Sequence, residues 1–210
     1  LRATIAPFAP ESYRDRMLIF RYAGFQYKTN ENWQSNGPVS YKTAKACFKE
    51  MAAPEAVTIT SSFSETMLAA KPAGEKVSCS VLQVDDDFWK VFKFDFLSGY
   101  PFDKATFDAG ATKAVISEDI ARQLFGTSDV VGKTFLLNHS AYMICGVVRP
   151  VSKLARYAYA QIWIPLSSTD AFTASWGEYG IMGMVSVYIL AKSQDDFPAI
   201  RMEAERLRDR

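Results

Sequence analysis

Two similar units, each made of one helix and one strand, lie near opposite ends of the chain, and this layout limits the folds that it can adopt. Residues 40–51 place apolar side chains on one helical stripe, and "EAVTITS" (55–61) follows as a strand. Near the other end, "MVSVYILA" (184–191) alternates like a strand and 195–210 reads as an amphipathic helix, with Asp195 or Asp196 as its cap. A sheet that joins these units must bring together distant parts of the chain.

The middle of the chain has a different amino-acid composition. Residues 84–102 are rich in aromatic side chains, and "DAGATKAVIS" (108–117) leads a strand into a helix. No internal repeat or low-complexity tract separates the parts. We therefore expect an α+β fold in which a central module is inserted between the two halves of an outer module.

Composition excludes several classes of protein. The chain has 210 residues, of which 49% are hydrophobic and 22% charged, an ordinary globular balance. Its 24 basic and 23 acidic residues leave a net charge of +1, whereas a nucleic-acid surface needs a basic excess. No apolar run approaches membrane-spanning length and no signal peptide opens the chain, so we expect any membrane anchors to lie outside it.

The stretch "FGTSDVVGKTF" (125–135) resembles the end of a phosphate-binding P-loop, but its spacing and context are wrong. Five residues separate Gly126 from Gly132, whereas the motif requires four. A P-loop also leaves a strand and enters a helix. Here Ser117 is a plausible cap for a helix that Gly126 ends in the left-handed conformation, and two strands joined at Asn138-His139 follow. Lys133 is therefore expected to be a solvated lysine at a strand end.

The other candidates for chemistry also have simpler structural explanations. Asp85, Asp86 and Asp87 lack the alternation and glycine of a calcium loop, so we expect one of them to cap a helix at "FWKVF". The aromatic residues that follow are expected in the core rather than in a ligand-stacking patch. His139 is expected in a hairpin turn. The cysteines, Cys47, Cys79 and Cys145, form no C-x-x-C pair and are expected as small buried residues. We predict no catalytic, cofactor-binding or metal-binding residue and no cofactor.

The middle segment resembles the periplasmic core domain of MacB-like, FtsX-family ABC transporter permeases. The resemblance is strong over residues 84–166, about two-fifths of the chain. It departs from the usual pattern at Tyr100, where arginine is common, and at Val130, where proline is common. The matching positions are Val84, Phe88, Leu97, Gly99, Phe102, Ala114 to Ser117, Leu124 to Gly126, Asp129, Val131 to Lys133, Tyr142, Gly146, Val147 and "IWIPL".

The resemblance implies a fold and a place in a larger protein. It implies a discontinuous porter-like subdomain, here residues 1–84 and 153–210, and a smaller inserted sabre-like subdomain, residues 85–152. The domain would lie between the first two transmembrane helices of a permease, on the periplasmic side of a bacterial inner membrane. Its partners would be an ABC ATPase domain or subunit and a second permease copy. A further partner would be either a periplasmic adaptor with an outer-membrane channel or a lipoprotein. Nucleic acid is not expected as a partner.

Two functions from different classes remain open at this level. In the first, the domain transmits motion: ATP hydrolysis in the cytoplasm moves it, and it moves or extracts a substrate without bond chemistry of its own. In the second, the chain is a free-standing periplasmic module whose aromatic-rich segment binds a peptide or lipid. An enzyme is not expected, because the chain contains no G-x-S-x-G elbow and its one histidine has no catalytic partner in sequence.

Overall fold

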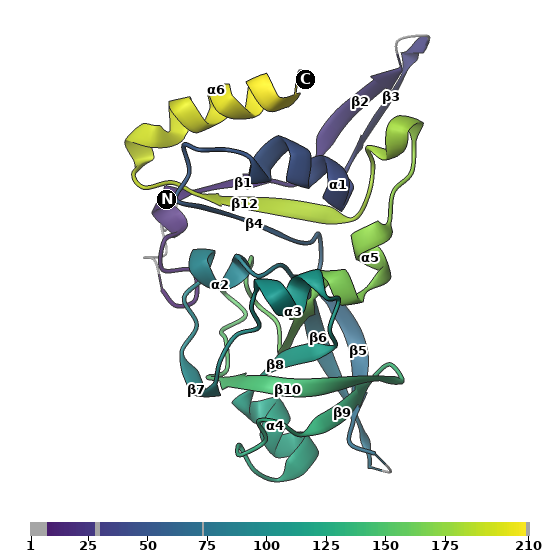
Figure 1. The fold of residues 1–210 in the computed structure, drawn as a ribbon, viewed down its shortest axis with the longest axis vertical. Coiled ribbons are helices and arrows are strands. Elements are labelled where there is room, and N and C mark those ends of the chain that lie inside the picture. Colours follow the sequence, from purple (N-terminus) through teal and green to yellow (C-terminus); the bar gives the residue numbers. More distant parts are fainter. Residues whose placement is uncertain (1–7, 28–29, 73, 209–210) are drawn as a thin grey trace.

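Two lobes stacked along the long axis make up the molecule in this computed structural model, which describes residues 8–27, 30–72 and 74–208 (Figure 1). The entry segment before Phe8 and the last two residues of the predicted C-terminal helix lie outside the described residues. The strands are β1 (Met17–Phe20), β2 (Ala23–Tyr27), β3 (Asn30–Gly37), β4 (Ala56–Ser61), β5 (Glu65–Ala70), β6 (Lys76–Val84), β7 (Phe96–Gly99), β8 (Lys113–Ser117), β9 (Thr134–Leu137), β10 (Ser140–Val148), β11 (Ile162–Pro165) and β12 (Val185–Leu190).

The helices are mostly short. The α-helices are α1 (Tyr41–Ala44), α2 (Phe88–Val91), α3 (Lys104–Asp108), α4 (Glu118–Phe125), α5 (Asp170–Thr173) and α6 (Phe197–Arg208). A π-helix, η2 (Lys45–Lys49), continues α1. Single 3₁₀ turns are η1 (Arg14–Arg16), η3 (Leu166–Ser168), η4 (Glu178–Gly180) and η5 (Gln194–Asp196).

One lobe is a closed ring of six strands, which we call the barrel. Its hydrogen-bonded order is β6, β11, β8, β10, β9 and β5, and β5 pairs back onto β6 along its whole length. β7 adds to the outside of the ring by pairing with the end of β10. Apolar side chains fill the interior, and α4 packs against the same core cluster through Ile120, Ala121 and Leu124.

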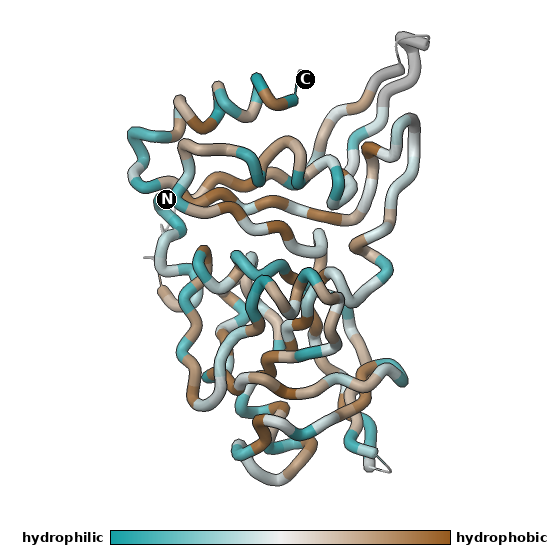
Figure 2. Tube along the Cα trace, viewed as in Figure 1, coloured by the Kyte–Doolittle hydropathy of each residue, from teal (hydrophilic) through white to brown (hydrophobic). Residues whose placement is uncertain are grey.

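The other lobe is an open sheet of three strands in the order β1, β12, β4. All six residues of β12 are buried, because α1, η2 and α6 cover one face while α2 and the outside of the barrel cover the other. Apolar stretches accordingly run along its strands in Figure 2. The hairpin β2–β3 forms a separate sheet that projects from this lobe (Figure 1).

The predicted elements at both ends of the chain are present, and they do meet in one sheet. β12 pairs with β4 over six residues, from Val185 opposite Ser61 to Leu190 opposite Ala56. The helix predicted at 40–51 begins as expected, with the Ser40 side chain accepting a bond from the Thr43 N–H. The expected cap of the last helix is wrong in detail. Ser193 is the capping residue of the preceding turn, and Asp196 completes a capping box by accepting from the Ser193 N–H.

The sheet does not separate at the expected subdomain boundaries. Strands from both sides of these boundaries share one barrel, since β5 pairs with β9 and β11 pairs with β8. The mixed α+β class is observed, while the finer division into porter-like and sabre-like parts stays a prediction. The lobes themselves meet where β4 touches β6 through one pair, Thr60 opposite Val84.

Candidate functional site

The 126–134 stretch has the geometry of a helix end. Gly126 follows α4 with φ of 74°, and its N–H donates to the Arg122 carbonyl, as predicted for a left-handed helix stop. Ser117 holds the cap position of α4, but its side chain makes no capping bond. Lys133 is exposed, with its ammonium 5.6 Å from the centre of the Phe125 ring. The order of elements is helix, loop and strand, so the segment lacks the strand-to-helix turn that cradles phosphate.

The acidic run 85–87 is part of a buried ion cluster that joins the lobes. Asp85 is fully buried, accepts bonds from the Thr58 hydroxyl at 2.6 Å and the Ile59 N–H at 2.9 Å, and lies 2.7 Å from the Lys49 ammonium. Asp87 pairs with Lys49 and Lys90, both at 2.6 Å. Asp87 holds the N-cap position of α2, as expected, but its carboxylate binds lysines and accepts from no helix N–H.

Burial and the neighbouring charges shift the pKa values of Asp85 and Lys49 in opposite directions. Burial raises the pKa of Asp85, while Lys49 and the bonds from Thr58 and Ile59 oppose that rise. Burial alone would lower the pKa of Lys49, but Asp85 and Asp87 hold it above its ordinary value. These bonds link η2 and β4 to the residues between β6 and α2, so the cluster fixes these elements against one another.

The aromatic segment that follows is core, as predicted. Phe88 and Phe92 are fully buried, and the Trp89 ring contacts Phe94 and Phe102 edge to face. These rings fill the space between the open sheet and the outside of the barrel. Trp89 and Phe94 are half-buried at the edge of this cluster.

The cysteines and the histidine lie apart from one another. Burial raises the pKa of Cys79 and of Cys145 to about 11, which keeps both thiols protonated and unreactive at neutral pH. Cys47 is half-buried and all three cysteines are free. His139 is exposed in the β9–β10 turn with φ of 75°. The residues that the structure describes contain no group of three or more His, Cys, Asp and Glu that could hold a metal ion.

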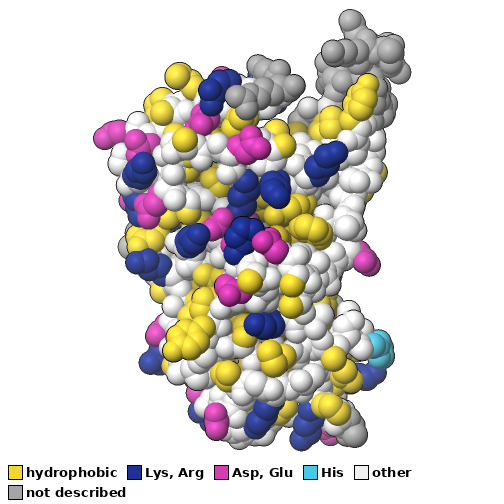
Figure 3. Space-filling model, viewed as in Figure 1, with side chains coloured by type: hydrophobic (Ala, Val, Ile, Leu, Met, Phe, Trp, Pro, Cys, Tyr) yellow, Lys and Arg dark blue, Asp and Glu magenta, His cyan; other side chains and the backbone are white. Residues whose placement is uncertain are grey.

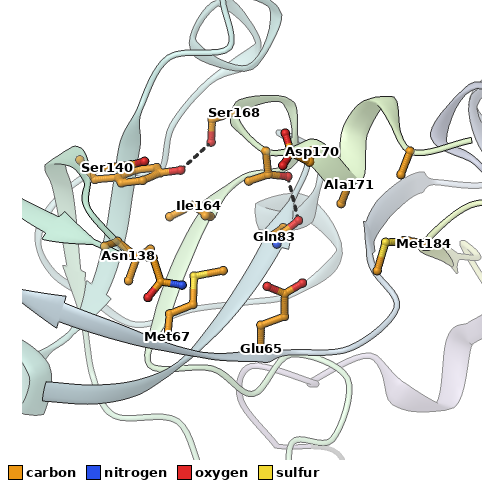
Figure 4. Close-up of a pocket in the computed structure, with 14 residues that line it drawn as sticks. Glu65, Met67, Gln83, Asn138, Ser140, Ile164, Ser168, Asp170, Ala171 and Met184 are labelled. Carbon is orange, nitrogen blue, oxygen red and sulfur yellow. Dashed lines mark hydrogen bonds between the residues drawn. The ribbon is translucent and has the colours of Figure 1, made fainter.

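The mouth of the barrel contains the largest cavity described here, of about 410 Å³ (Figure 4). Its floor is apolar and its rim carries two acids, Glu65 and Asp170, both exposed. Within, the Gln83 amide oxygen accepts from the Thr169 hydroxyl at 2.8 Å, and the Tyr142 hydroxyl lies 3.2 Å from that of Ser168. The lining residues are Glu65, Met67, Gln83, Leu137, Asn138, Ser140, Tyr142, Ile164, Ser168, Thr169, Asp170, Ala171, Ala174 and Met184.

The cavity has the composition of a binding surface. Its lining combines apolar side chains with hydroxyl groups, amides and two carboxylates. Sequence reasoning missed it, because its walls come from five barrel strands whose closure was not expected. The proline and glycine of "AAKPAGEKV" (69–77) were the available signal, since they predict a hairpin between β5 and β6.

Residues 4–207 match the protein family described as the MacB-like periplasmic core domain. Since the match takes in nearly the whole chain, the chain belongs to this family. The family is that of the periplasmic domains of ABC transporter permeases, which confirms the resemblance expected from residues 84–166. Among the described residues, no helix is long and apolar enough to cross a membrane.

Two curated relatives are longer permeases. The chain is 25% identical to the ABC transporter permease YknZ of Bacillus subtilis (strain 168) over 149 residues, which are 71% of this chain and 36% of that protein. It is 30% identical over 92 residues to the macrolide export ATP-binding/permease protein MacB of Pasteurella multocida (strain Pm70), 44% of this chain and 14% of that protein. The chain therefore spans well under half the length of these relatives.

Solved structures share the fold. The extracellular domain of the ABC-type transporter YknZ from Gram-positive bacteria superposes with a TM-score of 0.63 at 17% identity, covering 90% of this chain and 92% of that one. The periplasmic region of MacB from Actinobacillus actinomycetemcomitans gives a TM-score of 0.65 at 17% identity, covering 94% and 84%. At this identity the likeness concerns the arrangement of elements alone.

Proposed function

We propose that this domain transmits motion in an ABC transporter permease, coupling ATP hydrolysis in the cytoplasm to movement or extraction of a substrate on the periplasmic side. The family match over residues 4–207 is the observation that carries the proposal. The domain acts by changing position and contacts, and bond chemistry belongs to a separate nucleotide-binding domain or subunit.

The junction between the lobes supports this role. A domain that passes on motion must resist internal bending, and here Lys49 and Asp85 join the lobes through a buried ion pair that is costly to break. β1 and the C-terminal helix α6 belong to the open-sheet lobe, so the barrel stands at the opposite end of the molecule from α6 (Figure 1). Movement imposed on the open sheet is thereby carried to the barrel as a unit.

The partners follow from the same proposal. They are an ABC ATPase domain or subunit, a second copy of the permease, and on the far side an adaptor with an outer-membrane channel or a lipoprotein. The domain faces the periplasm of a bacterial inner membrane. Basic and acidic side chains are interspersed on the face seen in Figure 3, which offers no continuous basic track for nucleic acid.

A distance measurement in the full-length permease tests the proposal. A spin label at Arg122→Cys on α4, in a background with Cys47→Ser, Cys79→Ala and Cys145→Ala, reports the separation of the two barrels in a permease dimer. We expect its distribution to shift between the nucleotide-free and ATP-bound states. A matched sample whose ATPase cannot bind nucleotide should show no shift. Identical distributions in all states would contradict motion transmission.

The cavity at the barrel mouth favours the second candidate function, a periplasmic module that binds a peptide or lipid. Its apolar floor and hydroxyl-lined wall have the mixed character of ligand pockets. The gene that encodes the chain separates the two functions. Hydrophobic helices on both sides of the domain support the permease, whereas a secretion signal without further spans supports the free module.

A further inference from the structure

A second, smaller cavity on the junction between the lobes is lined by cationic and hydroxyl side chains. Its volume is about 230 Å³. Arg21 follows β1, residues 62–64 connect β4 to β5, and residues 156–159 lie on the segment before β11. Leu82 on β6 and Tyr188 on β12 also line it, so several separate parts of the chain converge on it. None of its lining residues is acidic.

Arg21 has one donor without an acceptor, its Nε, although its side chain also bonds to the Tyr188 hydroxyl. Its Nε is buried and has no hydrogen-bond partner among the described residues, and these residues also provide it with no ion pair. Its guanidinium lies over the Tyr157 ring, 5.4 Å from the centre, which restrains the plane of the group. A buried donor left without an acceptor is costly, so its retention calls for an acceptor that enters from outside.

Arg156 supplies a second charge at the rim of the cavity. It is exposed, and within the described ranges no carboxylate pairs with it. The nearby acid Glu11 is already engaged: it pairs with Arg14 and accepts from the Tyr157 N–H at 2.6 Å and the Ala158 N–H at 3.2 Å. The positive charge of the cavity is thus not cancelled by its surroundings.

Hydroxyl groups complete the wall. Ser62, Ser64 and Tyr188 line the cavity beside the arginines. Burial raises the pKa of Tyr188, while a hydrogen bond from the Arg21 side chain opposes that rise. The Tyr188 hydroxyl therefore accepts from Arg21, stays protonated at neutral pH and can donate its own proton to a ligand. The Ser61 hydroxyl, by contrast, is already used within the protein, because it donates to the Phe63 carbonyl and accepts from the Gln83 N–H.

We propose that this cavity binds a phosphate group. Guanidinium groups bind phosphate through paired, charge-assisted hydrogen bonds. A tetrahedral phosphate presents oxygens in several directions, which suits donors from four segments better than a flat carboxylate with two oxygens. The cavity is smaller than the range of about 300–1,000 Å³ typical of drug-sized ligands, and it accommodates a phosphate with a small substituent. The phosphate is either free in solution or part of a phospholipid head group.

Titration of the 210-residue chain with inorganic phosphate tests the site. Amide and arginine Nε–H signals are followed by NMR, and we expect saturable shifts at Arg21, Ser62, Ser64 and Tyr157 in the millimolar range. Arg21→Gln and Arg156→Gln should each weaken binding about tenfold or more. Arg122→Gln, an arginine on α4 at the barrel, is the matched control and should bind like the parent. Because Arg156 is exposed, its variant tests the proposal even where Arg21→Gln disturbs folding.

Two further arms distinguish the source of the phosphate. Glycerol 3-phosphate is titrated as a soluble ester, and flotation is measured with vesicles of phosphatidylglycerol in phosphatidylcholine against phosphatidylcholine alone. Soluble binding that needs both arginines, without flotation, identifies a free phosphate or a soluble phosphate ester. Flotation with phosphatidylglycerol that both arginine variants abolish identifies a lipid head group. Absence of saturable shifts and of flotation, or binding that neither arginine variant weakens, would overturn the proposal.

Discussion

The barrel and the open sheet solve the same problem, burying apolar strands, in different ways. The barrel closes on itself, so every one of its six strands has a neighbour on both sides and α4 packs against its core. The open sheet has β1 at one edge and depends on α1, η2, α6 and the barrel to cover its faces. The comparison teaches that the barrel is stable through its own pairing, while the open sheet is stable through what is packed against it.

The largest expected effect comes from breaking the junction between the two lobes. Asp85→Ala leaves Lys49 with one carboxylate fewer and leaves the Ile59 N–H and Thr58 hydroxyl without their acceptor. We expect a loss of about 3–5 kcal/mol in the free energy of unfolding, the usual cost of removing one partner of a buried pair. Urea denaturation checks this value. The exposed pair Lys104–Asp108 gives the control, since Asp108→Ala should cost less than about 1 kcal/mol.

A smaller but still large effect is expected from crowding the outside of the barrel. Gly99 has φ of 67°, and a Cβ there would lie 2.2 Å from the Cys145 carbonyl oxygen. Gly99→Ala therefore combines a left-handed backbone with a clash against β10, and we expect a loss of about 2–4 kcal/mol. A parent-like melting temperature for this variant would show that β7 moves away from β10 without cost.

Alkaline pH should weaken both lobes. The pKa values of Cys79, Cys145 and Lys49 lie above their ordinary values of 9.0, 9.0 and 10.5, so above pH 9 the unfolded chain loses protons that the folded chain keeps. Stability then falls as pH rises, with a slope of about 1.4 kcal/mol per pH unit for each such group. Urea midpoints from pH 7 to 11 measure the decline. Cys145→Ala should flatten it near pH 9–10, and an unchanged slope would contradict the assignment.

The helix end at Gly126 gives the smallest effects. A Cβ at Gly126 would meet nothing within 4 Å, so Gly126→Val is penalised by the backbone alone, and we expect about 1–2 kcal/mol. Lys133→Ala at an exposed site should change stability by about 0.5 kcal/mol or less. Calorimetric titration with ATP and magnesium should stay silent for the parent chain. Micromolar binding that Lys133→Ala abolishes would restore the P-loop interpretation.

Local sequence signals predicted the elements well, because their causes are local. Ser40 caps a helix through the Thr43 N–H, Gly126 ends one with positive φ, and Asn138 and His139 turn a hairpin with φ of 45° and 75°. Each of these depends on neighbours a few residues away, which a sequence displays directly.

Closure of the barrel and its cavities could not be predicted in the same way. β5 pairs with β9 through Ala69 opposite Leu137, residues that lie far apart in sequence and carry no local sign of contact. The role of Asp85 depends equally on Lys49 from a distant helix. Family resemblance over residues 84–166 supplied the class of domain, yet it gave no information on which strands outside that range complete the ring.

The position of β12 in the chain also determines the order in which the molecule can be assembled. β12 is the middle strand of the open sheet, but its residues, 185–190, come after every strand of the barrel. During synthesis, which proceeds from the N-terminus, residues 65–165 can close their ring while β1 and β4 still lack β12, the strand that lies between them. The first-made strands are thus the last to be paired, and their apolar edges must stay protected from other chains until the C-terminal segment arrives.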